Sequence, residues 1–352
     1  MKRLALFAAV LPAALVVSDA DSLAAMSAPK EAPAVTLPAW SSSLPSDEGL
    51  TDAARDAIQH EAHAFVRTAP ASATRDLLGQ LTGANVHCGR AHGAALSGAL
   101  AAGIDPVDVA AALERASTEC NEVIVEAAGF VPNPDRNLAV ALLRRANETG
   151  DESVRQSAWL AYGSIGVTAR THGNGELAGS VDSVLTNRLA SSSGDEHLLM
   201  VRAAGNAGCE SCAPLLAEDT KSSDDRLRRA AVASQRFLGS KDSVARMCNA
   251  LASDADGATR DLAAWSLEWR SNDGAERARC LESAAKNDRS KGVRLQAVRA
   301  LGILADDVEE AHDALGRLAL RNGEVGEIAQ RTLDVRKGGE EKSDESETVV
   351  LR

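Results

Sequence analysis

A repeated segment of roughly 32 residues in the second half of the chain restricts the fold more than any other sequence feature. Segments such as SDDRLRRAAVASQRFLG and KGVRLQAVRALGIL open with polar turn residues, continue with a basic residue and then carry an apolar residue three or four positions later. A sustained period of this length is typical of stacked helical pairs. Alignment of the segments brings six residues into one column, namely Arg155, His197, Arg228, Arg260, Arg294 and Gly326.

A second helical stretch follows each of these segments. In SVARMCNAL, residues 243–251, the apolar positions are spaced i, i+3, i+4 and i+7, which places them on one face of a helix. One pair of helices cannot bury both of its apolar faces, whereas stacked pairs form a continuous core. The sequence therefore predicts an all-α fold, an α-solenoid or superhelix of HEAT-like antiparallel helix pairs. Acidic residues suited to N-caps precede three of the first helices: Asp151, Asp224 and Asp256.

The start of the chain has the form of a secretory signal peptide. Two basic residues precede an apolar run, and Ser18-Asp19-Ala20 provides a cleavage site with small residues at both ends. The apolar run is short for a membrane span. We therefore expect an exported protein from a bacterium, periplasmic or extracellular, that does not span a membrane once residues 1–20 are removed.

Composition divides the rest of the chain into a linker, a cap, an array and a tail. The linker is rich in Ala, Ser and Pro, and the tail has almost no apolar residue, so both are predicted to be disordered. Prolines interrupt the predicted helices of the cap, which we expect to be irregular. The predicted boundaries are 21–48 for the linker, 49–135 for the N-terminal helical cap, 136–335 for the HEAT-like array and 336–352 for the charged tail.

Charge and composition exclude several classes of function. The formal net charge of −12 at pH 7 argues against a nucleic-acid partner, which needs a basic surface, and against adhesion to an anionic membrane. Aromatic residues make up only 3% of the chain, and no segment reads as an alternating strand. No Gly-rich phosphate loop, nucleophile elbow or catalytic triad spacing stands out. We expect no cofactor, no metal and no enzymatic activity.

Two segments of the array carry a family resemblance. LAYGSIG, residues 160–166, resembles the ALGSL segment of vitellogenin-type proteins, and LLMVRAAGNAG, residues 198–208, resembles their LLALKALGNAG segment. Residues 136–335 are thus similar to the helical domain of vitellogenin-like large lipid transfer proteins. The resemblance implies a stack of HEAT-like helical pairs and, for function, lipid binding or transfer. The chain lacks the sequence for the β-sheets that hold lipid in that family, so the resemblance implies the fold more than lipid carriage.

The six cysteines are disulfide candidates, because an even number in an exported chain favours bridges. Neighbours in sequence suggest the pairs Cys88 with Cys120, Cys209 with Cys212, and Cys248 with Cys280. Two alternatives stay open. CESC, which contains Cys209 and Cys212, could bind metal or act in thiol redox chemistry. Cys248 and Cys280 could be free thiols, because neighbouring helix axes lie about 8–10 Å apart and a bridge needs Cα atoms within about 7 Å.

The sequence predicts an exported, non-catalytic scaffold that binds a protein or peptide partner, because solenoids present extended binding surfaces. Lipid or lipoprotein handling is the first alternative, and a thiol redox role through CESC is the second. Aromatic anchors and a basic column could bind a partner, although such residues more often serve the core and the register of the repeats. The candidate partner-binding residues are Tyr162, Trp265, Trp269, Arg228, Arg260 and Arg294.

Overall fold

The fold is known from a computed structural model, which describes residues 37–347 except residues 43, 46, 84, 85, 87, 118, 119 and 271, and describes no side chain beyond residue 335. The predicted signal peptide, residues 1–20, and most of the predicted linker lie outside the described residues. Every regular element within that part of the chain is a helix. None of these helices is long and apolar enough to cross a membrane. The predicted all-α fold is confirmed.

Seventeen α-helices and three 3-10 helices are described. In the N-terminal part they are η1 (Ala39–Ser42), α1 (Asp52–Thr68), α2 (Ala71–Thr82), α3 (Arg90–Ala101), α4 (Pro106–Arg115), α5 (Asn121–Ala128) and α6 (Arg136–Glu148). The middle part contains α7 (Glu152–Thr171), α8 (Gly175–Ser191), α9 (Gly194–Ala207), η2 (Glu210–Cys212), α10 (Ala213–Asp219), α11 (Asp225–Ser234) and η3 (Gln235–Phe237). The C-terminal part contains α12 (Lys241–Ser253), α13 (Gly257–Leu267), α14 (Gly274–Asn287), α15 (Lys291–Leu304), α16 (Glu309–Ala319) and α17 (Glu324–Glu347).

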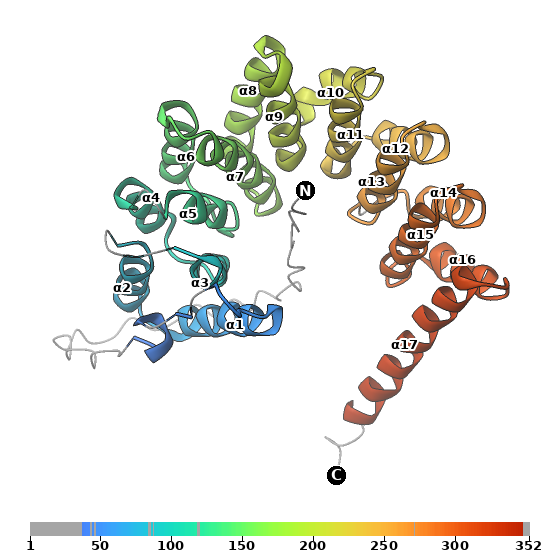
Figure 1. The fold of residues 1–352 in the computed structure, drawn as a ribbon, viewed down its shortest axis with the longest axis horizontal. Coiled ribbons are helices and arrows are strands. Elements are labelled where there is room, and N and C mark those ends of the chain that lie inside the picture. Colours follow the sequence, from blue (N-terminus) through green and yellow to red (C-terminus); the bar gives the residue numbers. More distant parts are fainter. Residues whose placement is uncertain are drawn as a thin grey trace, which may run out of the picture. The chain divides into compact units, whose positions relative to one another are not determined.

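The helices form two layers (Figure 1). Each odd-numbered helix from α1 to α17 packs against the next odd-numbered one, as α7 packs against α9 and α13 against α15. Even-numbered helices pack against one another in two stretches: α4 packs against α2 and α6, and α14 packs against α12 and α16. Pairs such as α6 with α7 and α14 with α15 join the two layers. This arrangement of stacked helical pairs is the one that the repeat period predicts.

The three predicted N-caps are confirmed. The Asp151 carboxylate accepts hydrogen bonds from the backbone N–H groups of Ser153 and Val154 at the start of α7. Asp224 caps α11 and Asp256 caps α13 through the same pair of positions. Each cap satisfies backbone donors that a helix leaves without partners at its N-terminus.

Two glycines of the motifs that carry the family resemblance lie where odd-numbered helices meet. A Cβ atom at Gly163 on α7 would overlap the carbonyl oxygen of Ala203 on α9. A Cβ atom at Gly205 on α9 would overlap the side chain of Ser234 on α11. The glycines of these motifs are therefore explained by close packing of neighbouring odd-numbered helices, without any ligand.

The apolar core is divided at α11 and η3. One cluster of buried side chains runs from Ala62 to Leu238 and a second runs from Val232 to Leu333. The predicted cap, residues 49–135, shares the first cluster with the start of the array, so no separate core marks a boundary at residue 135.

Helix α17 extends past residue 335, the predicted end of the array, and reaches Glu347. The composition of residues 336–347, by contrast, predicts part of a disordered tail. The segment contains no proline, and its Glu and Lys residues favour a helix once the preceding turns are fixed by packing against α15 and α16.

Candidate functional site

Two arginines of the aligned column are bound by carboxylates. Arg228 on α11 donates from Nε to Asp254 Oδ2 over 2.8 Å and from Nη2 to Asp254 Oδ1 over 3.2 Å. Arg260 on α13 makes the same bonds to Asp288 over 2.7 and 3.0 Å. Asp254 and Asp288 each follow the last residue of the second helix in the repeat. We call each such pair a rung.

A third bond links each rung to the repeat before it. The Nη1 group of Arg228 donates to the carbonyl oxygen of Ser222, and that of Arg260 donates to the carbonyl oxygen of Asp254, each over 2.8 Å and each six residues earlier. Asp254 therefore accepts from Arg228 through its carboxylate and from Arg260 through its backbone. Successive repeats are fixed in register by this chain of bonds.

These bonds correct the predicted binding role of Arg228 and Arg260. Arg260 is 3% exposed, and the hydrogen bonds and charge of Asp288 hold its pKa above the ordinary value. Burial opposes ionisation of Asp288, but the hydrogen bond from Arg260 prevails and lowers the pKa of that carboxyl. His197 occupies the same column, and its Nε2 lies 3.1 Å from Asp219. Arg228, Arg260 and His197 of the column therefore hold repeats together instead of lining a surface.

Tyr162, the third predicted anchor, also lies in the core. It is 3% exposed on α7, and its ring packs edge-on against Trp159 with the ring centroids 6.0 Å apart. Burial raises the pKa of the Tyr162 hydroxyl to about 12. Because its side chain shares the buried face of α7 with Ala158 and Ile165, it cannot anchor a partner at the surface.

Trp265 and Trp269 remain partly exposed and are joined by an aromatic residue that the sequence did not suggest. Their ring centroids lie 5.6 Å apart on α13 and the turn that follows it. Phe237, at the end of η3, packs edge-on against Trp269 at 6.4 Å. All three side chains are half-buried. We call these three residues the aromatic patch.

A buried guanidinium supports the patch. Arg236 lies over the ring of Phe237 at 4.6 Å and over that of Trp265 at 5.5 Å. It donates to Asn206 Oδ1 over 2.7 Å and to the Ala233 carbonyl oxygen, and no described carboxylate pairs with it. Burial lowers the pKa of Arg236 to about 10, so the group stays charged at neutral pH. The aromatic patch thus lies against the fixed positive charge of Arg236, which has no acidic partner among the described residues.

A titratable carboxyl stands next to the patch. Burial raises the pKa of Glu268 to about 7, although the charge of Arg299 acts in the opposite direction. Ionisation of Glu268 is therefore less favourable than ionisation of an exposed carboxyl.

The three predicted disulfides are confirmed as Cys88–Cys120, Cys209–Cys212 and Cys248–Cys280. Cys248 on α12 and Cys280 on α14 have Cα atoms 5.7 Å apart, so the neighbouring helices approach closely enough for a bridge. The alternative of two free thiols at these positions is wrong.

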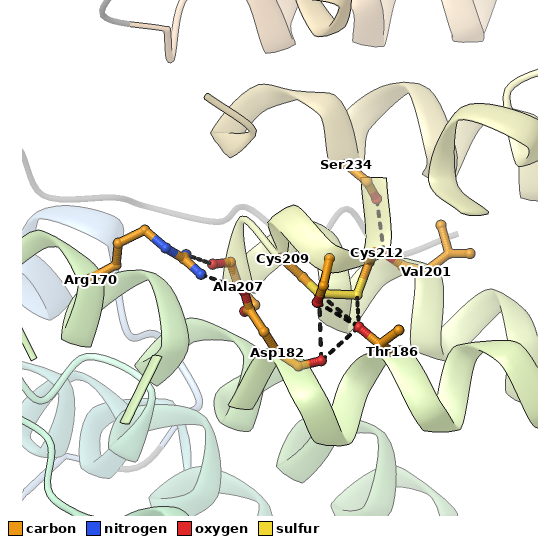
Figure 2. Close-up of a disulfide and its surroundings, with 9 residues drawn as sticks. Arg170, Asp182, Thr186, Val201, Ala207, Cys209, Cys212 and Ser234 are labelled. Carbon is orange, nitrogen blue, oxygen red and sulfur yellow. Dashed lines mark hydrogen bonds and ion pairs between the residues drawn. A yellow bond between two sulfur atoms is a disulfide. The ribbon is translucent and has the colours of Figure 1, made fainter. Parts of the chain in front are cut away.

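The CESC bridge lies in the segment between α9 and α10 and packs against α8, where polar side chains surround it (Figure 2). The Thr186 hydroxyl is 3.3 Å from Cys212 Sγ and 2.7 Å from the Ser211 hydroxyl. Arg170 pairs with Asp182 at 2.8 Å and also donates to the Ala207 carbonyl oxygen, which ties the bridge to α7. Both cysteines are fully buried. Thiol exchange needs an accessible sulfur, so this arrangement favours a structural bridge.

Sequence reasoning missed Phe237, Arg236 and Asn206. Arg236 and Phe237 lie in a 3-10 helix that interrupts the pattern of the repeats. Asn206 belongs to GNAG, which the sequence analysis interprets only as a family motif. The aromatic residue directly before Leu238-Gly239 was the one available signal. Among the described residues, no group of three or more His, Cys, Asp or Glu side chains could hold a metal ion.

The chain was compared with known protein families, proteins and solved structures. No protein-family model matches the chain, and no curated protein matches it. A solved structure of human deoxyhypusine hydroxylase in complex with glycerol matches with 17% identity and a TM-score of 0.32, covering 71% of this chain and 98% of that one. The matched structure is that of an enzyme, and the prediction that this chain is not an enzyme is withdrawn. A likeness this distant transfers no activity to the chain.

Proposed function

We propose that this protein is an exported repeat scaffold that binds a protein or peptide partner at the aromatic patch. The observation that carries the proposal is the convergence of Phe237, Trp265 and Trp269, all half-buried, in a chain that is only 3% aromatic. Trp and Arg are the residues that most often dominate binding energy at interfaces. Stacked helical pairs commonly supply the rigid support for such a surface.

Charge suggests the chemistry of the partner. Arg236 holds a positive charge against two rings of the patch and has no carboxylate partner among the described residues. A partner with an acidic group beside an apolar side chain would be attracted by this buried charge and would contact the exposed parts of the rings. The partner proposed here is therefore an acidic protein segment.

Export is part of the same proposal. Three disulfides persist most readily in an oxidising compartment, and the N-terminal residues have the form of a signal peptide. Lipid binding and thiol redox chemistry stay predictions, since no contact described above favours either.

The test uses a photo-crosslinking amino acid placed at Trp265 in the full chain, in the source cell. The matched control carries it at Val140, an exposed apolar residue on α6. We expect a discrete crosslinked protein from position 265 and none of that mass from position 140. Crosslinks that are absent at 265, or identical at both positions, contradict the proposal.

Affinity for the identified partner then provides a quantitative check. Trp265→Ala should weaken binding by about 30-fold, the effect of losing one dominant interface residue. Val140→Ala should leave the dissociation constant unchanged. Equal affinities for the two variants would exclude the aromatic patch as the binding surface.

A further inference from the structure

The chain contains the dipeptide Asn-Gly twice, and the first copy is held by hydrogen bonds. Asn174-Gly175 begins α8, where the Asn174 side chain accepts a hydrogen bond from the backbone N–H of Leu177 over 3.2 Å. The Asn174 backbone N–H donates to the Ala169 carbonyl oxygen over 2.8 Å, and the Asn174 carbonyl oxygen accepts from Ala178. Both the side-chain amide and the main chain of this copy are therefore restrained.

The second copy, Asn322-Gly323, lies in the turn between α16 and α17 and lacks these restraints. Both residues are exposed. Among the described residues, none forms a hydrogen bond with the Asn322 side chain, and none accepts from the backbone N–H of Gly323. Gly323 has a φ of 92°, and nothing lies within 4 Å of a Cβ atom built on it. The Asn322 amide and the Gly323 nitrogen are thus free to approach each other.

An unrestrained Asn-Gly pair can lose ammonia without an enzyme. The Gly323 backbone nitrogen attacks Cγ of Asn322, so a C–N bond forms, the Cγ–Nδ2 bond breaks, and the amide nitrogen leaves as ammonia with the proton from Gly323. Glycine favours this attack because it has no side chain to obstruct it. Water then opens the succinimide ring at either carbonyl group, which gives Asp or isoaspartate. In isoaspartate the main chain runs through the former side chain.

The surroundings of Asn322 favour this reaction. Asn322 and Gly323 line an open depression together with Arg321, Glu327 and Arg331. Water therefore reaches the pair. The two arginines outnumber the carboxylate, and their positive charge stabilises the negatively charged nitrogen and oxygen that form during the attack.

The packing of α17 against α16 leaves no room for isoaspartate in the turn. Gly326, the last residue of the aligned column, packs so closely that a Cβ atom there would overlap the carbonyl oxygen of Arg321. Ala329 and Leu333 of α17 are buried in the second apolar cluster. Isoaspartate lengthens the main chain by one atom between these contacts, so the first turn of α17 must move away from α16.

We infer that Asn322 is a site of spontaneous deamidation, and that its isoaspartyl product loosens α17 from the end of the array. The reaction needs only water, so the modified fraction increases with the age of the protein. The inference does not involve the aromatic patch, so it and the proposed function fail separately.

The first experiment compares the two Asn-Gly pairs within one molecule. The full chain is incubated at neutral pH and deamidation at each pair is followed by peptide mapping with mass spectrometry. Asn174 should react about 10-fold more slowly than Asn322, the factor that corresponds to the N-cap bond that it must first break. In urea, which removes the cap, the two rates should converge. Equal rates in the folded protein, or a difference that persists in urea, would overturn the inference.

The isoaspartyl product is identified by its chemistry. A protein isoaspartyl methyltransferase with S-adenosylmethionine should methylate the peptide that contains residues 322 and 323 in the aged protein. The same peptide from freshly purified protein should accept no methyl group. A deamidated peptide that accepts none would contain Asp alone and would contradict the isoaspartyl product.

Hydrogen exchange of the aged protein tests the effect on α17. We expect lost protection in α17 and in α15 and α16, which pack against it. Freshly purified Asn322→Asp carries the charge of the product without the longer main chain, and it should keep its protection. Equal protection in aged and fresh protein, or the same loss in Asn322→Asp, would show that isoaspartate does not release the helix.

Discussion

At the scale of single residues, burial decides which side chains can contact a partner and which only stabilise the fold. Arg260 and Tyr162 had seemed to be surface anchors because arginine and tyrosine are common at interfaces, yet both lie inside the array. The sequence alone could not distinguish these roles, because an arginine at a repeated position can form an ion pair between repeats or contact a partner protein. The carboxylates after α12 and α14 decide the question for Arg228 and Arg260.

The Arg260–Asp288 rung can be measured by a double-mutant cycle. Replacing either residue by Ala leaves a buried charge without a partner, so each single variant should lose about 3 kcal/mol of unfolding free energy. The double variant should lose much less than the sum. Urea unfolding followed by circular dichroism gives the four values, and strict additivity would show that the pair is not coupled.

Acid should weaken the pairing of α14 with α16 through Glu282. The hydrogen bond from Arg317 lowers the pKa of Glu282 from 4.5 to about 2, so its stabilising effect is complete above pH 4.5 and is lost as the pH falls toward 2. Glu282→Gln should abolish that part of the pH dependence. Melting temperatures of both proteins between pH 2 and 6 test it, and parallel curves would contradict it.

Glu268 should act in the opposite sense. Its folded pKa of about 7 lies above the ordinary value of 4.5, so the folded state loses stability as the pH rises from 4.5 to 7. Glu268→Gln removes the cost of ionising a buried carboxyl, and we expect it to melt higher than the unaltered protein at pH 8 and at about the same temperature at pH 4. A lower melting temperature at pH 8 would be contrary evidence.

At the scale of helices, close approach between odd-numbered helices is a strict requirement. The repeat period predicts that the helices pair. The structure adds that the absence of a side chain at Gly163 permits the close contact between α7 and α9. Helices that the sequence predicts near residues 51–67, 72–83, 89–101, 106–118 and 136–146 correspond to α1, α2, α3, α4 and α6. No helix is predicted at α5, a short helix ahead of two prolines.

Gly163→Ala should therefore cost about 1–3 kcal/mol, because the added methyl group meets the backbone of α9 and the helices must separate. Gly179→Ala is the matched control, since nothing lies within 4 Å of a Cβ atom at that helical position. There the exchange should stabilise α8 by about 0.5–1 kcal/mol. Chemical denaturation of both variants gives the comparison, and effects of the same sign would contradict the packing described here.

At the scale of the whole molecule, the period of the repeats determined most of the fold. The layered pairing of helices, the N-caps and the disulfide pairs all followed from local spacing. The break between the two apolar clusters at α11 and η3 did not, because it depends on Gln235 and Arg236, which are buried polar residues inside an otherwise apolar stack. The aromatic patch lies at this same break, and sequence reasoning missed it for the same reason.

The central claim is that stacked helical pairs are held in register by rungs, with each repeat supported only by its neighbours. Hydrogen exchange in Arg260→Leu, followed helix by helix, tests this most directly. The expected result is lost protection in α13, α14 and the helices packed against them, with α1 to α7 unchanged. Uniform loss along the chain, or no change around α13 and α14, would contradict it.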